Sequence, residues 1–404
     1  MNSLQHPVVE PAARPEEPER FPPALLEQPP AVRQEHFESR CLIEHPRLLD
    51  AVEATMQAIC APGNGTSTRR PGTMVLVIGP SRVGKTTLIR LLEERLLVRG
   101  AAQMRQDCGY QPWARITAPG SETGRFDWQD YYKAVLRGFQ DPFVDGRTAR
   151  IPTRELREAM EMALLERKPL AIIVDEAHHL AKATNGRRLQ DQLDHLKHIE
   201  NLTSVSHVLV GTYELRPFRT VNAQLACRSV DVHFPRYDAT NAEDCRIFRS
   251  VLWALQRQLP VADEPPLADQ HWQFLYARSI GCIGLLKLHL NRALNLALTE
   301  EASSVTGTHL RKTALSAARV ELALRHALES EADLVEADGT DERLLALLGV
   351  HTSLMPAARP SKPAEGAQRP LATMSRSHRH QPGRRKEGRD ALAAVAGAEE
   401  RATG

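Results

Sequence analysis

The segment IGPSRVGKTT, residues 78–87, constrains the fold of this chain more than any other part of its sequence. It fits the pattern G-x-x-x-x-G-K-[ST], an apolar run precedes it, and the helical pattern LIRLLEERLL follows it. Glycines in such a loop let successive backbone N–H groups curl around phosphate oxygens where a strand gives way to a helix. The segment therefore predicts a phosphate-binding loop made of Gly79, Pro80, Ser81, Arg82, Val83, Gly84, Lys85, Thr86 and Thr87.

A pair of carboxylates complements this loop. Asp175 and Glu176 follow an apolar run in PLAIIVDEAHHL, which is typical of a buried strand. We expect Lys85 to reach the β and γ phosphates, and the Thr86 hydroxyl and Asp175 to hold Mg²⁺. Glu176 is the candidate to polarise the attacking water. The two motifs predict a site for ATP and Mg²⁺ and an ATPase activity. No motif indicates which nucleotide base the site prefers.

Composition limits the setting of the protein. The chain has 404 residues, 42% of them hydrophobic, which is enough for two or three domains with cores of their own. Its formal net charge is only +2, so contact with nucleic acid would need a local basic patch. The six cysteines form no C-x-x-C pair, and no run reaches the roughly 18 apolar residues of a membrane span. We therefore expect a cytoplasmic protein that does not enter a membrane.

Short apolar runs alternate with helical patterns between residues 36 and 238, which predicts a parallel sheet covered by helices. The expected strands are 74–78, 113–117, 170–174, 205–210 and 230–234. Beyond them only helical spacing remains, so residues 239–330 are expected to form a small all-helical domain. The Pro- and Glu-rich residues 1–35 and the basic residues 331–404 are expected to be mostly disordered.

The order of these elements resembles the AAA+ family of P-loop ATPases, with a five-stranded parallel core followed by a helical lid. The segment SHVLVGTYEL ends an apolar run at Thr212, and the resemblance implies that Thr212 contacts the γ phosphate or the water. The segment LRPFRTVNAQLACRSVDVHFPRYD resembles the branches in which an arginine before the last core strand reaches the nucleotide of a neighbouring subunit. Arg228 matches that position, with Arg216 and Arg219 as further candidates.

The predicted lid departs from the family pattern. The segment SIGCIGLLKLHLNRAL matches the helix on which many relatives carry a second sensor arginine, but Gly284 stands at that position here. Lys287 lies about one turn later and is the one candidate to replace it. The sequence leaves this replacement open.

Within the AAA+ family, residues 36–300 resemble transposition regulators of the TniB and TnsC type, from Tn7-like and Tn5053-like elements. The segments that carry the resemblance are FESRCLIEHPRLLDAVEATMQAI, ITAPGSETGRFDWQDYYKAVLRGF and LVGTYELRPFRTVNAQLACRS, in this order around the phosphate loop. The resemblance implies ATP-bound subunits that assemble as rings or helical filaments on duplex DNA, and that recruit a transposase and a target selector. Candidate DNA contacts lie in and near the long interval between the two nucleotide motifs: Arg115, Arg125, Lys133 and Arg137.

Parts of the sequence also fit three other functions. A DEAH helicase shares Asp175 to His178, but it needs a second recombinase-like domain, for which the remaining helical sequence is too short. A signalling switch that never touches DNA would use the same nucleotide site. An origin-type loader is favoured by the segment FPRYD, but the sequence beyond residue 330 is too short to supply a winged-helix domain.

Overall fold

The computed structural model describes residues 18–60, 72–120, 126–145, 151–181, 186–220, 229–334 and 340–348. The chain divides into two units, one ending at Glu336 and one beginning at Ala337. Of the second unit, the structure describes helix α17 (Thr340–Leu347) and the residue after it.

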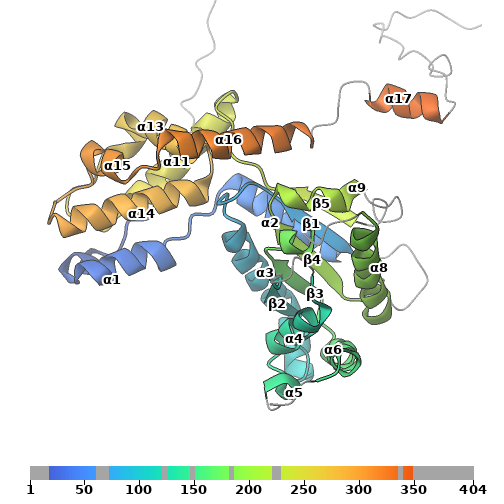
Figure 1. Ribbon diagram of the computed structural model, residues 1–404. Helices are drawn as coiled ribbons and strands as arrows, with labels where there is room; N and C mark the ends of the chain where they lie inside the picture. The colour runs from blue at the N-terminus through green and yellow to red at the C-terminus, as the bar shows by residue number, and fades with distance from the viewer. Residues whose placement is uncertain are drawn as a thin grey trace, which may run out of the picture. The chain divides into compact units, whose positions relative to one another are not determined.

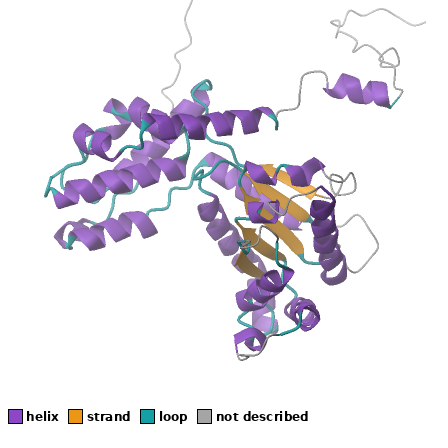
Figure 2. Cartoon of the chain, in the orientation of Figure 1, coloured by secondary structure: helices purple, strands orange, loops and turns teal. Residues whose placement is uncertain are grey.

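The centre of the first unit is one parallel sheet (Figures 1 and 2). Within the described residues it has five strands in the order β2-β3-β4-β1-β5, and every pairing is parallel. The strands are β1 (Met74–Ile78), β2 (Trp113–Thr117), β3 (Ala171–Asp175), β4 (Ser206–Gly211) and β5 (Ser229–His233). The predicted five-stranded parallel sheet is confirmed, and each strand lies within a residue of its expected position.

Alternation of side chains along the strands divides the core into two layers. On one face, Val75 and Val77 of β1 pack with α2 (Pro46–Cys60) and α3 (Lys85–Gln106). On the other, Leu76 and Ile78 pack with a second set of helices. That set comprises α4 (Trp128–Gly138), α6 (Thr153–Arg167) and α8 (Gly186–Thr203). The short elements α5 (Pro142–Asp145), α7 (His178–Ala181), η3 (Tyr213–Leu215) and α9 (Pro217–Thr220) join these parts.

A helical region follows the sheet. It comprises α11 (Ala242–Arg257), α12 (Leu267–Gln270), α13 (Trp272–Ser279), α14 (Ile283–Thr299), α15 (Gly307–Thr313) and α16 (Ala317–Ala332). Asn241 caps α11 by accepting from the N–H groups of Glu243 and Asp244. These helices enclose an apolar cluster of their own. We propose residues 36–238 and 239–330 as the two domains.

Parts of the predicted N-terminal arm and C-terminal tail form helices in the structure. Residues 18–35, expected to be part of an extended arm, form η1 (Pro23–Glu27) and α1 (Pro30–Glu35), and the π-helical turn η2 (His36–Arg40) follows. Phe21 is buried and Arg33 Nε donates to Pro260 O at 2.9 Å, which fixes the segment on the helical region. At the other end, α16 continues to Ala332 and α17 lies within the expected tail. Residues 1–17 and 349–404 lie outside the described residues.

No helix in the described part of the chain is long and apolar enough to span a membrane.

Candidate nucleotide-binding site

The phosphate loop joins β1 to α3, and two of its glycines are sterically required. A Cβ on Gly79 would lie 2.2 Å from Phe234 O, because β1 and β5 pair at this point. Gly84 has φ of +123°, a conformation that L side chains rarely adopt. Arg82 also has a positive φ, of 60°. The sequence therefore folds this turn as the strand-to-helix loop that the motif predicts.

Lys85 begins α3 and lies over the loop. Its Nζ donates to Pro80 O at 2.8 Å and to Gly79 O at 3.2 Å. Burial lowers the pKa of Lys85, while the charges of Glu176 and Asp175, among others, oppose the shift. The loop lysine and the two carboxylates of the second motif therefore lie within electrostatic reach of one another, although 90 residues separate Lys85 from Asp175.

The carboxylate pair stands at the end of β3. Asp175 Oδ1 accepts from Glu176 N at 2.9 Å, and Glu176 has φ of +52°. A positive φ at a non-glycine residue is uncommon and often occurs at functional sites. Glu176 Oε2 lies 3.2 Å from His178 Nδ1. The turn directs the two acidic side chains differently, which suits one to hold a metal and the other to act on water.

Arg115, one of the predicted DNA contacts, lies beside the carboxylate pair. It lies on β2, which pairs with β3, and its Nη2 is 3.1 Å from Asp175 Oδ2. Its Nη1 is 3.8 Å from Glu93 Oε2 on α3. Burial raises the pKa of Glu93, and Arg115 opposes that shift. The guanidinium therefore lies between the acidic groups of the candidate site, and the place of β2 beside the Asp-Glu strand is the signal that could have indicated this position.

Thr212 follows β4 and faces the phosphate loop. Its Oγ1 is shielded from solvent and has no hydrogen-bond partner among the residues that the structure describes. It borders a cavity of about 500 Å³ together with Pro80 and Ser81 of the loop. A buried polar atom without a partner is costly, and the position of Thr212 beside this cavity makes a phosphate oxygen a suitable partner for its hydroxyl.

A second cavity, of about 370 Å³, continues from the other side of the loop. Its walls come from the loop and the start of α3, from the segment 38–48, and from the first turns of α14. Sequence reasoning missed most of this lining: Leu42, Ile43, His45, Leu48 and Ile283. The mixture of aliphatic side chains and one imidazole fits the base and sugar of a nucleotide whose phosphates lie at the loop.

The helix α14 contributes Lys287 to the lining of this cavity, but backbone carbonyls already accept from its ammonium group. A Cβ on Gly284 would lie 2.5 Å from Arg82 O, so the helix begins in contact with the phosphate loop. Lys287 Nζ donates to Cys41 O at 2.6 Å and to Glu38 O at 2.9 Å. Lys287 therefore holds the N-terminal segment against the helix, which disfavours it as a replacement for the missing second sensor.

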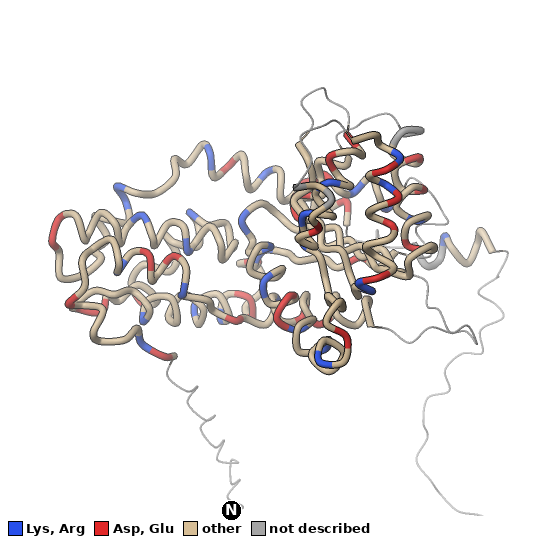
Figure 3. The backbone as a smooth tube through the Cα atoms, turned by 90° about the horizontal axis from the view of Figure 1, so that it is seen from below, with Lys and Arg blue, Asp and Glu red and all other residues tan. Residues whose placement is uncertain are grey.

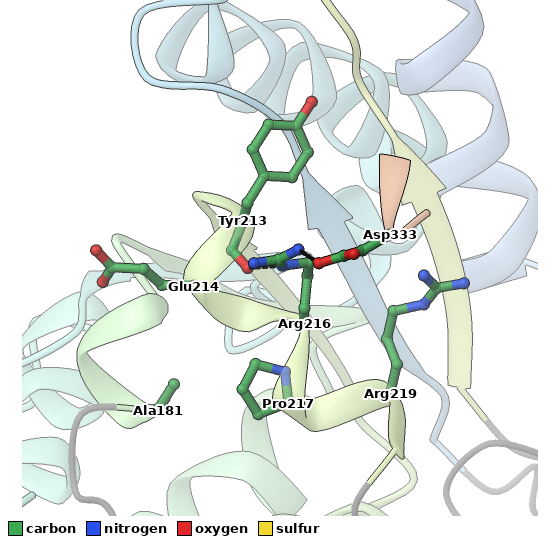
Figure 4. A pocket seen from close by; sticks show the side chains of 7 residues that line it. All are labelled: Ala181, Tyr213, Glu214, Arg216, Pro217, Arg219 and Asp333. Atoms are coloured by element: carbon green, nitrogen blue, oxygen red, sulfur yellow. Dashed lines mark hydrogen bonds and ion pairs between the residues drawn. The ribbon is translucent and has the colours of Figure 1, made fainter. Parts of the chain in front are cut away.

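The arginines considered for contact with a neighbouring subunit have different surroundings. Arg216 pairs with Asp333, and Arg219 pairs with Asp231. Figure 4 shows Arg216 and Asp333 directed toward each other, with Arg219 to one side. Arg228 lies outside the described residues, directly before the start of β5 at Ser229.

The remaining predicted DNA contacts lie away from the nucleotide site or are not described. Lys133 and Arg137 are on α4, and Lys133 Nζ is 3.5 Å from Asp130 Oδ1. Arg125 lies outside the described residues. Figure 3 shows basic and acidic residues interspersed along the described helices, in keeping with the small net charge.

Comparison with known proteins supports the class that the site indicates. Residues 68–218 match a family model described as an AAA domain. Among curated proteins no match was found. The motifs, the strand order and the family match define an AAA-type P-loop ATPase domain with the AAA+ fold.

Solved structures resemble the chain at low sequence identity. The ORC2 protein of Aeropyrum pernix has a TM-score of 0.47 and 15% identity, over 69% of this chain and 70% of that one. Cdc6p from Pyrobaculum aerophilum has a TM-score of 0.46 and 13% identity, over 69% and 70%. A structure titled as Drosophila ORC bound to DNA has a TM-score of 0.42 and 14% identity, over 86% and 88%. Similarity of this degree does not extend to function.

Proposed function

We propose that this protein is an ATP-dependent regulator of DNA transposition. In its ATP-bound state it oligomerises on duplex DNA and links a target selector to the transposase, and hydrolysis releases the assembly. The observation that carries the ATPase part is the convergence of Lys85, Asp175, Glu176 and Thr212 on one phosphate loop. The resemblance of the flanking segments to TniB- and TnsC-type regulators supports the transposition part.

In the proposed reaction, the loop N–H groups and Lys85 bind the β and γ phosphates. Thr86 and Asp175 would hold Mg²⁺, which would supply positive charge against the negative charge that develops on the phosphate oxygens. Glu176 accepts the proton of the attacking water, and Thr212 donates a hydrogen bond to the γ phosphate. Each of these groups is held by a strand end or a helix start, so little reorganisation is needed during the reaction.

Assembly enters the mechanism through Arg228. A cation near the γ phosphate is worth orders of magnitude in rate when a neighbouring subunit supplies it. Within the described residues, Arg216 and Arg219 are neutralised by Asp333 and Asp231, which favours Arg228 for this role. Hydrolysis would then depend on contact between subunits, and the assembly would control its own lifetime.

DNA binding is proposed through phosphates, with Arg125, Lys133 and Arg137 as candidate contacts. Contacts to phosphates make binding tolerant of sequence and sensitive to salt. The five described free thiols support the proposed location in a reducing cytoplasm, where dispersed cysteines stay unpaired.

The experiment that tests this proposal is electron microscopy of the full chain with duplex DNA at low salt. The samples contain a slowly hydrolysed ATP analogue or ADP. Rings or filaments on DNA are expected with the analogue and not with ADP. Lys85→Ala is the control, and it should bind nucleotide weakly and form no assembly.

Two outcomes would count against the proposal in different ways. Tight nucleotide binding without any DNA association would support a signalling switch in place of a DNA regulator. Assembly on DNA with ADP as readily as with the analogue would contradict control by ATP. Neither outcome would change the assignment of the ATPase site, which Lys85→Ala tests by itself.

A further inference from the structure

The C-terminal end of α16 contacts the part of the core that follows Thr212. Glu331 Oε1 accepts from the Tyr213 hydroxyl at 3.3 Å, and Glu331 Oε2 lies 3.1 Å from Arg236 Nη2. Two residues on, Asp333 pairs with Arg216. We call Tyr213, Arg216, Arg236, Glu331 and Asp333 the α16 latch. It joins the last helix of the helical region to the turn after β4 and to the segment after β5.

The two core residues of the latch that contact Glu331, Arg236 and Tyr213, are buried. Arg236 is 7% exposed, and Tyr213 is 6% exposed. Burial raises the pKa of Tyr213 well above its usual range, and the charge of Glu331 adds to the shift. Tyr213 also contacts His233 Nε2 at 3.1 Å. A buried guanidinium needs a partner, and Glu331 forms an ion pair with Arg236, while the charge of Asp238 also acts on it.

The α16 latch lies close to the cavity at the phosphate loop. Thr212 is adjacent to Tyr213 in the chain and borders the cavity of about 500 Å³ at the loop, and its shielded Oγ1 has no hydrogen-bond partner among the described residues. The opposite wall of this cavity belongs to α16, through Ala323, His326, Ala327 and Ser330. Helix α16 therefore faces the phosphate loop across the space that Thr212 borders.

The buried thiol of Cys282 lies within reach of charges from both the phosphate loop and the α16 latch. Burial raises the pKa of Cys282 to about 12, and the charges of Arg236, Glu331 and Lys85 all act on it. Cys282 precedes α14 and is fully buried. The loop lysine and the latch pair are therefore both within electrostatic reach of one side chain.

Helix α14 carries no arginine at the second sensor position. Gly284 stands there, and Lys287, which lines the cavity of about 370 Å³, donates to two backbone carbonyls. We propose that Tyr213 and Glu331 are positioning residues that tie Thr212 to α16, so that a γ phosphate at Thr212 sets the position of this helix. The inference rests on the proposed ATPase function. When the phosphate accepts a hydrogen bond from the Thr212 hydroxyl, the turn after β4 is fixed and the α16 latch holds the helix. After phosphate release the contacts of the latch loosen.

The test is hydrogen exchange of the full chain with Mg²⁺ and either a slowly hydrolysed ATP analogue or ADP. In the unmodified protein, amides of residues 317–332 should exchange about fivefold more slowly with the analogue than with ADP, because local opening is suppressed. In Glu331→Gln and Tyr213→Phe this ratio should fall below about two, while analogue affinity stays within about threefold. Tyr213→Phe keeps the packing, so it tests the tie even where Glu331→Gln leaves Arg236 unpaired and the fold weakened.

The matched control is Glu321→Gln. Glu321 lies on the same helix but pairs with the exposed Arg325 at 3.0 Å, so the exchange ratio should remain that of the unmodified protein. Steady-state kinetics give a second readout: Tyr213→Phe should lower kcat about tenfold with KM within about threefold, as expected for a residue that acts after binding.

Three outcomes separate this inference from the proposed function. An exchange ratio near fivefold in both latch variants would overturn the tie. Nucleotide binding without any difference in α16 between analogue and ADP would also overturn it and would leave the ATPase site intact. Failure of the unmodified protein to bind nucleotide would remove the proposed function, and the tie with it.

Discussion

At the scale of single residues, the structure separates the roles of side chains that the sequence could only group together. Lys85, Asp175 and Glu176 come from motifs with fixed spacing, and all three meet at the end of β1 and β3. Arg115 has no motif, and only strand pairing places it beside Asp175. A charged side chain on a strand can face solvent or an oppositely charged group on the next strand. The pairing of the strands decides which of the two it meets.

We expect Glu176→Gln to bind ATP with nearly unchanged affinity and to lose about 100-fold or more in kcat, because general-base contributions are of this size. The amide keeps the shape of the side chain but cannot take a proton. Single-turnover hydrolysis and equilibrium binding of a fluorescent nucleotide measure the two effects. Hydrolysis at the normal rate would show that another group activates the water.

Arg115→Met should lower the Mg²⁺ concentration needed for nucleotide binding, by about threefold or more. The guanidinium neutralises Asp175 and repels a divalent cation, and removing it strengthens the local negative potential. A Mg²⁺ titration of nucleotide binding, read by anisotropy, gives the measurement.

Lys133→Met on α4 is the matched control for Arg115→Met, because Lys133 pairs only with an acidic residue on its own helix in the described contacts. If Arg115→Met leaves the Mg²⁺ requirement unchanged and weakens DNA binding, the original prediction of a DNA contact is correct for Arg115 and the role at Asp175 is wrong.

At the scale of elements, the segment before α2 is the part that the sequence described least well. Residues 18–35 were expected to be disordered because of their proline and acidic content, but Phe21 and the buried Phe37 just after them anchor the segment on the helical region. Further on, His45 Nδ1 lies 2.9 Å from the Tyr237 hydroxyl, and the ring stacks on Phe234 at 6.2 Å. A few apolar contacts far apart in sequence outweigh the local composition.

The contact of His45 predicts a dependence of stability on pH. Burial, with a smaller effect of Arg47, lowers the pKa of His45 to about 4. Because the unfolded imidazole titrates near 6.5, the unfolded chain binds more protons between these values. The contribution is therefore fully present above about pH 6.5 and is lost as the pH falls toward 4, by up to about 1.4 kcal/mol per pH unit.

His45→Asn should reduce this slope, since the amide does not titrate. Urea unfolding at several values between pH 7 and pH 4 gives the free energy of unfolding at each pH. A slope equal to that of the unmodified protein would show that His45 does not remain neutral in the fold.

At the scale of the whole molecule, function depends on what the subunits do together. The proposed assembly places one subunit's Arg228 at its neighbour's γ phosphate, so each ATPase site is built from two chains. Two inactive variants can therefore complement each other, because one molecule can supply the nucleotide-binding part and another the arginine.

Arg228→Ala alone and Glu176→Gln alone should each lose about 100-fold or more in ATPase rate, since a trans arginine and a general base are each worth orders of magnitude. Mixed in equal amounts, they should regain part of the activity, because Glu176→Gln still binds ATP and supplies Arg228 to the intact site of its neighbour. The rate of phosphate release in the mixture is the measurement. If mixing restores nothing while both proteins assemble on DNA, the arginine does not act between subunits.

The sequence by itself determined the ATPase class of this protein. The phosphate loop, the carboxylate pair and the five strands are encoded locally, because the motif spacing and the apolar periodicity act over a few residues. These features would be recognised in any chain that carried them in this order. The role of Thr212 stays a prediction, which rests on the resemblance to the AAA+ family.

Only the tertiary structure decided which groups act around that site. Arg115 joins Asp175 through strand pairing, Lys287 is held by backbone carbonyls of segment 38–41, and Glu331 reaches the residue next to Thr212. The reason is physical: each of these contacts joins residues that lie 60 to 249 positions apart in the chain. Local pattern carries no information about such pairs, because they form only when the layers of the fold pack together.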